Sequence, residues 1–394
     1  MLRYLVILLL AQGILSRRDE VDTYLKAIKR RITQDGYPFE EHSIETKDGY
    51  ILGVHRISYS PVSGRSPKKP PVFIQHGLLS SSNDWIVSGP GKGLAYILAD
   101  AGYDVWMGNA RGNTFSRKHK TLSPKDKRFW AFSWDEIGYY DLPAMIDYVL
   151  KKTGRTSLNY IGYSQGTTSF FVMTSLRPEY NKKIKSMHAL APVAFMSNVI
   201  NPFLRVLAPR ISKMSYLQSI LGNFEFMPSS KFMALAGAAL CRRTSVFKVL
   251  CKNALFLIGG FNPDNLNASL IPEIVKGAPA GASINQIIHY AQSVVSGHFR
   301  RYDFGTSKNK ARYGRSDPPD YPLKKITAPV HLYYGNNDWL TSKKDVQILA
   351  SKLPNVPYNK MVPNPKFNHL DFMWATNIYN LVYGDLINNL KAYT

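Results

Sequence analysis

Residues 158–176, LNYIGYSQGTTSFFVMTSL, decide the fold of this chain. Residues 158–161 predict a buried strand, and residues 167–176 predict a helix. The pentapeptide at 162–166 joins the two elements and places Ser164 between two glycines, which is the arrangement of a nucleophile elbow. A Gly-x-Ser-x-Gly pattern alone is weak evidence, because chance supplies it in about one unrelated chain in ten of this length. Its position between a strand and a helix makes Ser164 a candidate nucleophile and argues against an incidental turn.

The rest of the chain repeats the alternation of strand and helix on both sides of this stretch. Because strands that alternate with helices pair in parallel, the pattern predicts an α/β fold with a mostly parallel central sheet. The alternation stops between about residues 195 and 300, where helical spacing, Pro, Gly and both cysteines replace it. We expect this region to be an inserted, mainly helical cap. Expected strands lie at 70–75, 103–107, 184–191 and 329–335, and expected helices at 94–101, 140–152 and 372–390.

The N-terminus has the pattern of a signal peptide. Arg3 precedes a run of apolar residues that is too short to cross a membrane, and charged residues follow it at once. Cleavage is expected between about residues 13 and 16. The predicted segments are 1–16 for the signal peptide, 17–194 for the first part of the core, 195–300 for the cap or lid, and 301–394 for the second part of the core.

The composition is strongly basic, with 50 Lys and Arg against 27 Asp and Glu and a formal net charge of +23. Such a charge suits anionic lipid surfaces, nucleic acid or acidic partners. The basic residues occur in short scattered runs, and no nucleic-acid-binding module accompanies them. The sequence therefore argues against nucleic-acid binding. It leaves open both attraction to anionic lipid surfaces and an ordinary basic surface.

Two cysteines, Cys241 and Cys251, are present. Export would place them in an oxidising compartment, where we expect them to form a disulfide that contributes about 3 kcal/mol at most. Free thiols are the alternative. Two thiols without a nearby pair of histidines do not make a four-ligand zinc site, so no metal site is predicted. Asn267 begins the sole N-glycosylation sequon, Asn267-Ala268-Ser269, which is credible only in an exported chain.

A serine hydroxyl is a weak nucleophile, so Ser164 needs a base and an acid that orients the base. In the elbow-containing folds the chain order is Ser, then Asp or Glu, then His. His369 is the one histidine beyond the strand expected at 329–335, and Asp338 follows that strand in a turn with two asparagines. Asp371 and Asp345 compete with Asp338, but the first is placed to cap the last helix and the second lies in a predicted helix.

Acyl transfer also needs hydrogen-bond donors for the developing oxyanion. The elbow itself places the backbone N–H of Gln165 for this role. The strand expected at 70–75 leads into His76-Gly77-Leu78, the position of the loop that usually supplies the second donor, and the Leu78 N–H is our choice. His76 is expected to support this loop and not to take part in the chemistry.

With these residues in place, the chain resembles the acid lipase family of the α/β hydrolases, which includes gastric and lysosomal acid lipases. The similarity spans nearly the whole mature chain and is far more specific than the pentapeptide. The segments that carry it are 48–52 (DGYIL), 75–79 (QHGLL), 108–113 (GNARGN), 140–144 (YDLPA), 164–168 (SQGTT), 189–193 (ALAPV) and 368–372 (NHLDF).

The resemblance implies a hydrolase of neutral lipid esters, with Ser164, Asp338 and His369 as its triad. It also implies the Leu78 and Gln165 amides as oxyanion hole and a movable lid over an apolar crevice. Cys241 and Cys251 look like the disulfide of the family's cap. The chain departs from the family where Tyr163 replaces the usual His before the nucleophile, where Gly259 replaces a Cys of some members, and where residues 363–366 lengthen the approach to His369.

The expected reaction needs no metal or organic cofactor. The expected partner is a lipid ester at an oil–water or membrane interface, and the expected destination is secretion or the lysosome. Rival functions are an esterase for short-chain soluble esters, a lipid-binding or storage protein without turnover, and membrane attachment through the basic surface. The complete set of Ser164, Asp338 and His369 argues against a pure binding role.

Overall fold

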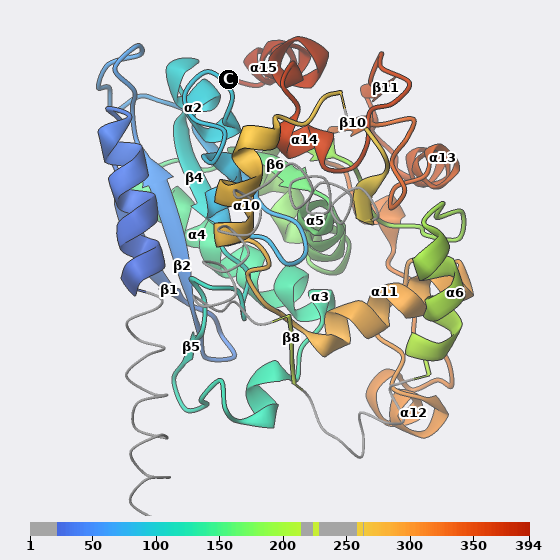
Figure 1. The fold of residues 1–394 in the computed structure, drawn as a ribbon. Coiled ribbons are helices and arrows are strands. Elements are labelled where there is room, and N and C mark those ends of the chain that lie inside the picture. The colour runs from blue at the N-terminus through green and yellow to red at the C-terminus, as the bar shows by residue number, and fades with distance from the viewer. Residues whose placement is uncertain (1–21, 214–223, 228–257, 263) are drawn as a thin grey trace, which may run out of the picture.

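A nine-stranded sheet forms the centre of the molecule (Figure 1). The computed structural model describes residues 22–213, 224–227, 258–262 and 264–394, so the expected signal peptide and both cysteines lie outside the described residues. The strand order is β1-β2-β4-β3-β6-β7-β10-β11, with β5 paired to β2. Strands β1, β2, β4 and β5 pair antiparallel through β2, and all pairs from β4 to β11 are parallel, so the predicted mostly parallel sheet is confirmed. The strands are β1 (Glu40–Glu45), β2 (Tyr50–Ile57), β3 (Pro71–Gln75), β4 (Asp104–Gly108), β5 (Lys118–His119), β6 (Leu158–Tyr163), β7 (Ile184–Leu190), β10 (Val330–Tyr334) and β11 (Tyr358–Met361).

Helices cover both faces of the sheet, which therefore has two cores. Because successive side chains of a strand point to opposite faces, β3 sends Val72 and Ile74 into one core and Phe73 into the other. The first core lies under the helix at 22–34 and under α2 and α15, and the second lies under α4, α5 and α13. These helices are α2 (Leu94–Asp100), α4 (Leu142–Thr153), α5 (Gln165–Leu176), α13 (Lys343–Lys352) and α15 (Gly384–Lys391).

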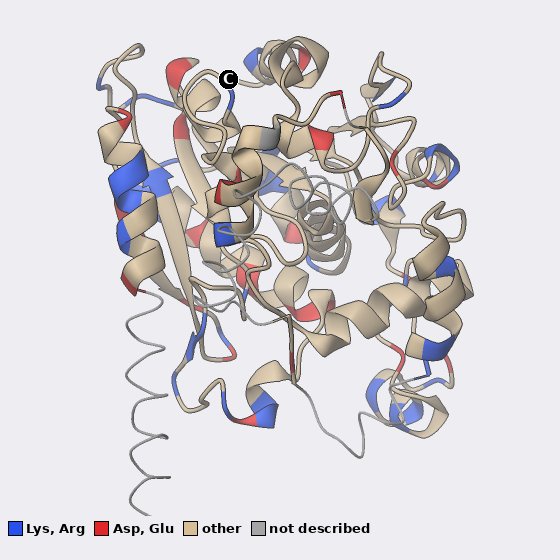
Figure 2. Cartoon of the chain, in the orientation of Figure 1, with Lys and Arg blue, Asp and Glu red and all other residues tan. Residues whose placement is uncertain are grey.

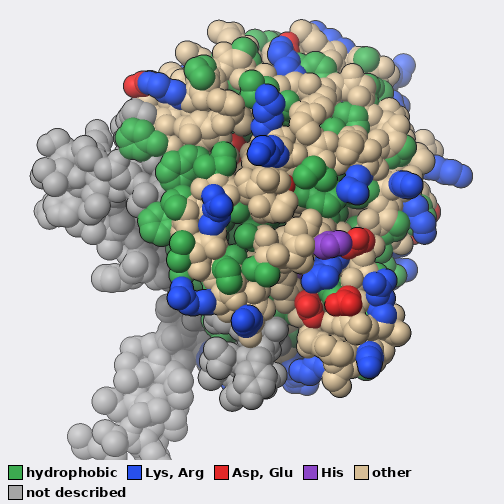
Figure 3. Space-filling model, turned by 90° about the vertical axis from the view of Figure 1, so that its right-hand side faces the viewer, with side chains coloured by type: hydrophobic (Ala, Val, Ile, Leu, Met, Phe, Trp, Pro, Cys, Tyr) green, Lys and Arg blue, Asp and Glu red, His purple; other side chains and the backbone are tan. Residues whose placement is uncertain are grey.

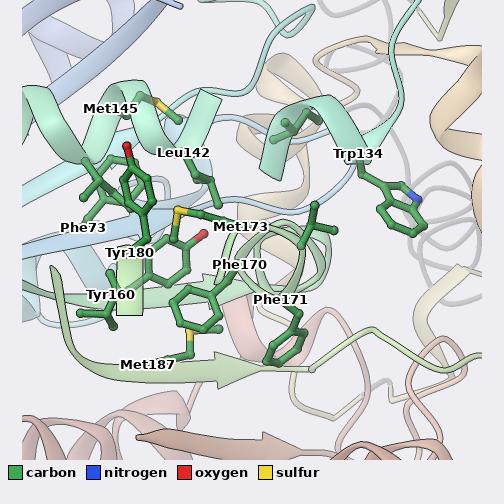
Figure 4. Close-up of a cluster of buried hydrophobic side chains, with 14 of the residues drawn as sticks. Phe73, Trp134, Leu142, Met145, Tyr160, Phe170, Phe171, Met173, Tyr180 and Met187 are labelled. Atoms are coloured by element: carbon green, nitrogen blue, oxygen red, sulfur yellow. The ribbon is translucent and has the colours of Figure 1, made fainter. Parts of the chain in front are cut away.

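The second core fixes α5 behind strand β6 (Figure 4). Tyr160 of β6 packs on Phe170 of α5 with ring centroids 4.9 Å apart, and Phe73, Leu142 and Met145 complete the contact from β3 and α4. All five side chains are fully buried. Burial of a large apolar side chain contributes roughly 1.5–3 kcal/mol. The turn between β6 and α5, which carries Ser164, is therefore held by two rigid elements.

Two ion pairs of the buried Arg111 join three segments of the chain. The Arg111 side chain is almost completely buried and binds Asp141 at 2.6 Å and Asp48 at 2.6 Å. Its guanidinium also lies 4.0 Å from the centre of the Tyr50 ring. Asp141 ends a π-helical turn, Ile137–Asp141, that follows α3 (Trp134–Glu136) and runs into α4. The conspicuous 108–113 segment of the sequence therefore has a structural role.

The described part of the expected cap is mainly helical. It contains α6 (Pro202–Ile211), α10 (Ile271–Gly277) and α11 (Ile284–Ser296), and two short strands, β8 (Glu225–Phe226) and β9 (Ala282–Ser283), that pair antiparallel. After the cap come α12 (Thr306–Tyr313) and the return to the sheet at β10. The boundaries at 195 and 300 stay a prediction.

The expected single helix at 372–390 is wrong. The chain forms α14 (Asp371–Trp374), leaves the helix at Ala375, and resumes through a π-helical turn, Tyr379–Tyr383, into α15. Ala375 forms an isolated β-bridge with Leu266, and the Thr376 amide donates to the carbonyl of Asn265 at 2.8 Å. These bonds to the segment before α10 pull the backbone out of the helix.

Candidate active site

The backbone at Ser164 is held in a conformation that few residues other than glycine adopt. Its φ is +52° and its ψ is −117°. The turn requires both flanking glycines. A Cβ on Gly162 would lie 2.8 Å from the Gly166 carbonyl carbon, where β6 crosses α5, and a Cβ on Gly166 would collide with the Gln75 carbonyl of β3. The Ser164 amide donates to the Leu190 carbonyl at 2.9 Å. The turn therefore lifts the Ser164 side chain to the carboxyl edge of the sheet.

The structure brings Ser164, His369 and Asp338 together in one chain of hydrogen bonds. Nδ1 of His369 lies 2.8 Å from Oδ2 of Asp338, and Nε2 lies 2.9 Å from Oγ of Ser164. A carboxylate only accepts, so Nδ1 carries the proton and Nε2 accepts from the serine hydroxyl. His369 is 3% exposed and Asp338 is fully buried, which keeps bulk water away from both bonds.

Asp338 is fixed from two directions in the loop after β10. While Oδ2 faces the imidazole, Oδ1 accepts from the backbone amides of Leu340 at 2.9 Å and Thr341 at 2.7 Å. The two competing carboxylates lie elsewhere: Asp345 binds the Asn198 amide, and Asp371 accepts from the side chain of Asn262. Of these three carboxylates, Asp338 is therefore the one that is hydrogen-bonded to His369.

Two contacts that no sequence pattern singled out for this purpose hold the loop of His369. The His369 amide donates to the Gly259 carbonyl at 3.1 Å, and the Tyr163 hydroxyl donates to the His369 carbonyl at 3.0 Å. A Cβ on Gly259 would lie 2.8 Å from Cγ of Leu370, so this close approach requires glycine. Tyr163 and Gly259 are two of the positions at which the chain departs from the family pattern. That departure was the signal in the sequence that could have pointed to these contacts.

The loop after β3 runs directly beside the nucleophile. A Cβ on Gly77 would lie 3.1 Å from the Ser164 Cβ and 3.2 Å from the Tyr163 ring. Within the described residues, the amides of Leu78 and Gln165 have no acceptor in the protein, so both remain able to bind a ligand. Gln165 follows Ser164 in the chain, and Leu78 follows Gly77, which lies against Ser164. The role of both amides as oxyanion donors stays a prediction.

His76 supports this loop as a neutral ring. Its Nε2 accepts from the Ala110 amide at 3.1 Å, so Nδ1 carries the proton and donates to the Gly77 carbonyl at 2.7 Å. Burial lowers the pKa of His76 to about 4. The ring fixes Gly77 against the segment after β4 and makes no hydrogen bond to Ser164 or His369.

A buried carboxyl group, that of Asp84, lies in the short 3-10 helix Ser82–Trp85 that follows this loop. Asp84 binds the Ser80 hydroxyl through Oδ2, while Oδ1 has no hydrogen-bond partner among the described residues. Burial raises the pKa of Asp84 to about 7. Asp84 is therefore protonated and neutral at acidic pH.

The described residues hold no group of three or more His, Cys, Asp or Glu side chains that could bind a metal ion. In the same part of the chain, every helix is too short or too polar to cross a membrane.

Comparison with sequence families defines the class to which this fold and site belong. Residues 70–376 match the family described as the α/β hydrolase fold, and residues 28–89 match the family described as the partial α/β-hydrolase lipase region. Among solved structures, a monoglyceride lipase from Saccharomyces cerevisiae shares the fold with a TM-score of 0.54 at 14% identity, covering 90% of this chain and 95% of that one.

Similar proteins of known name identify the family within the α/β hydrolases. The chain is 49% identical to Lipase 3 of Drosophila melanogaster, with 92% of each chain covered. It is 43% identical to human gastric triacylglycerol lipase, covering 92% of this chain and 90% of that one, and 41% identical to human lysosomal acid lipase/cholesteryl ester hydrolase, covering 91% and 89%. The chain therefore belongs to the acid lipase family of the α/β hydrolases.

Proposed function

We propose that this chain is a lipase that hydrolyses carboxylic esters of neutral lipids, with Ser164 as nucleophile, His369 as general base and acid, and Asp338 as the group that orients His369. The observation that carries the proposal is the continuous hydrogen-bond chain from Asp338 through His369 to Ser164. The similarity to named lipases along more than 90% of the chain supports the same activity.

Acylation follows from this geometry. Nε2 of His369 takes the hydroxyl proton while Oγ of Ser164 attacks the ester carbonyl, and the buried Asp338 stabilises the imidazolium that forms. The amides of Leu78 and Gln165 donate hydrogen bonds to the carbonyl oxygen and stabilise the negative charge that develops on it. Loss of one such donor typically costs about 100- to 1,000-fold in kcat.

Acylation ends when His369 gives its proton to the departing alcohol, which leaves the acyl group on Ser164. Deacylation uses the same groups with water as the nucleophile. His369 takes a proton from the water that attacks the acyl carbonyl, and it returns that proton to Ser164 as the fatty acid leaves. Protons balance in each half, so the mechanism draws on no cofactor.

Triacylglycerol and sterol esters are the proposed substrates, because relatives bear the names triacylglycerol lipase and cholesteryl ester hydrolase. The proposed partner is a lipid interface, and the net charge of +23 adds attraction to anionic lipid. The region at 195–300 is proposed to form the cap over the acyl site. The alternative function is that of an esterase for short-chain soluble esters. Such an enzyme would not hydrolyse its substrate faster at a lipid interface.

Export to the outside of the cell or to the lysosome is also proposed, through the signal peptide at 1–16. Oxidation would then join Cys241 to Cys251. Asn267 would carry a glycan: it is partly exposed in a turn, and its side-chain oxygen accepts from the amide and the hydroxyl of Ser269 at 3.0 and 2.8 Å.

Labelling and hydrolysis together test the function. Wild-type protein should react with a fluorophosphonate probe and release fatty acid from long-chain emulsions, whereas Ser164→Ala should do neither. A chain-length series below and above the solubility limit separates a lipase, which gains rate at the interface, from a soluble esterase. A folded wild type that binds lipid but is neither labelled nor active would show a binding protein and refute the proposal.

A further inference from the structure

Helix α6 is apolar on both of its sides. Leu204 and Ala208, one helical turn apart, face inward, and Leu204 packs on a cluster around Met196. An apolar side of a helix is normally packed against the protein, but the second apolar side of α6 faces solvent. Its exposed apolar residues are Phe203 (53% exposed), Val206 (64%) and Leu207 (44%). This spacing of three and four places them in one stripe.

Cations surround this stripe without acidic partners. Arg205, Arg210 and Lys213 are exposed and form no ion pair with a described residue. Between residues 180 and 224 the sequence contains no Asp or Glu, and from 195 to 263 it has eight Lys or Arg against a single acid. That acid, Glu225, pairs with Arg117 of the core. The exposed cations of α6 therefore have no acidic partner among the described residues.

Helix α12 extends the cationic surface. Ile211, at the end of α6, and Phe304, just before α12, pack on the same cluster of Ile288 and Tyr302, so the two helices are neighbours. The ribbon segments coloured blue for Lys and Arg on both helices lie at the right and lower right of Figure 2. Figure 3, which looks onto this side, shows apolar side chains with basic ones among and beside them. The exposed cations of α12 and the residues after it are Lys308, Lys310, Arg312 and Arg315, and the exposed acids beyond them are Asp317 and Asp320.

The start of α6 is attached directly to the candidate active site. The Asn201 amide donates to the carbonyl of Trp339, the residue after Asp338, at 3.0 Å. Its side chain donates to the Ile258 carbonyl at 3.0 Å, one residue before the glycine that holds His369. A surface that binds α6 therefore lies at a fixed position relative to the triad.

We propose that the α6 face, defined as Phe203, Val206 and Leu207 with Arg205, Arg210 and Lys213, docks the enzyme on an anionic lipid surface. The inference rests on the proposed function and names the surface that acts at the interface. Apolar side chains enter the headgroup boundary while the cations bind anionic headgroups, and the arginine and lysine stems lie along the apolar region. A second copy fits poorly, because two uncompensated cationic faces repel each other.

Vesicle binding of the full chain tests the proposal without relying on catalysis. Ser164→Ala protein is mixed with vesicles of phosphatidylcholine alone or with phosphatidylglycerol, and bound protein is measured by sedimentation at two salt concentrations. We compare Arg205→Glu/Arg210→Glu with Lys29→Glu/Arg30→Glu, which changes the net charge equally but lies on the helix at the opposite side of the molecule (Figure 1). Phe203→Ser/Val206→Ser removes the apolar part.

The α6 charge variant should bind the anionic vesicles about 30-fold more weakly or worse, since each basic residue near such a surface contributes about 1 kcal/mol. The control should lose far less, and the apolar variant should bind both kinds of vesicle more weakly. Equal losses in the two charge variants would show attraction by net charge alone and overturn the proposal. Binding to polyglutamate but not to vesicles would overturn it in favour of an acidic protein partner.

Hydrolysis of a soluble short-chain ester, measured with Ser164 intact, separates this inference from the proposed function. Both charge variants should keep the wild-type rate on that ester, and the α6 charge variant should lose far more rate on anionic emulsions than the control. A wild type inactive on every ester would refute the proposed function, while the vesicle result would still decide the role of the α6 face.

Discussion

Removal of one hydroxyl, in Tyr163→Phe, should slow catalysis with little effect on substrate binding. The Tyr163 hydroxyl donates to the backbone carbonyl of His369 at 3.0 Å, and the two rings lie 5.2 Å apart. The variant leaves this carbonyl unsatisfied in a buried place, which costs about 1–3 kcal/mol. The loop can recover part of that energy only by moving, and His369 moves with it.

A shift of about 1 Å at a catalytic group can lower the rate by about 100-fold, so kcat should fall by about 10- to 100-fold while KM stays near its wild-type value. The assay is hydrolysis of a soluble chromogenic ester across a range of pH, with urea unfolding of the same samples.

Tyr383→Phe is the matched control, because its buried hydroxyl also donates to a backbone carbonyl, that of Phe372, at 2.6 Å. It should lose similar stability and keep kcat and the pH profile. If Tyr163→Phe loses stability as the control does and keeps the wild-type kcat and pH profile, Tyr163 does not position His369.

Three further variants test the buried charges. Burial holds the pKa of Asp84 at about 7 in the folded protein against an ordinary 3.8, so the folded state keeps a proton that the unfolded chain has released. Stability should then fall by up to about 4 kcal/mol as pH rises from 4 to 7, and Asp84→Asn should remove this slope in unfolding curves. His331 has the opposite sign: burial lowers its pKa to about 4 from 6.5, so stability should fall by up to about 3 kcal/mol as pH drops from 6.5 to 4. His331→Phe should flatten that acid limb, and an unchanged limb would refute the assignment. Asp141→Ala, which deprives the buried Arg111 of one partner, should lower the free energy of unfolding by about 3–5 kcal/mol in urea, and a loss below about 1 kcal/mol would show that Asp48 alone suffices.

The elements next to Ser164 could be predicted because their signals are local. A β-prone apolar run, two glycines around a serine and a helical stretch specify the elbow within about twenty residues, and the structure places strand β6 and helix α5 there. Chain order selected His369, and a position just after a strand end favoured Asp338 over Asp345 and Asp371, since the carboxyl ends of parallel strands meet at one edge of the sheet. Selecting these two candidates required only the order of strands and helices along the chain, and not the way in which they pack.

The C-terminal helix shows where local signals fail. Its helical spacing is continuous through Ala375, yet the bridge to Leu266 and the bonds of Thr376 to Asn265 break it. These contacts join segments more than a hundred residues apart. A competing hydrogen bond of this kind overrides helix propensity, which differs by less than about 1 kcal/mol between ordinary residues.

By itself the sequence determined the α/β fold, the nucleophile elbow at Ser164 and the residues eligible to act with it. Tertiary structure alone decided that Asp338, and neither Asp345 nor Asp371, faces His369. It also decided that the Tyr163 hydroxyl and the Gly259 carbonyl hold the His369 loop, and that the apolar side of α6 stays uncovered. The physical reason is that hydrogen bonds act over about 3 Å and require particular directions, so they depend on how distant loops meet in space, whereas the pattern of a strand or helix depends on neighbours along the chain.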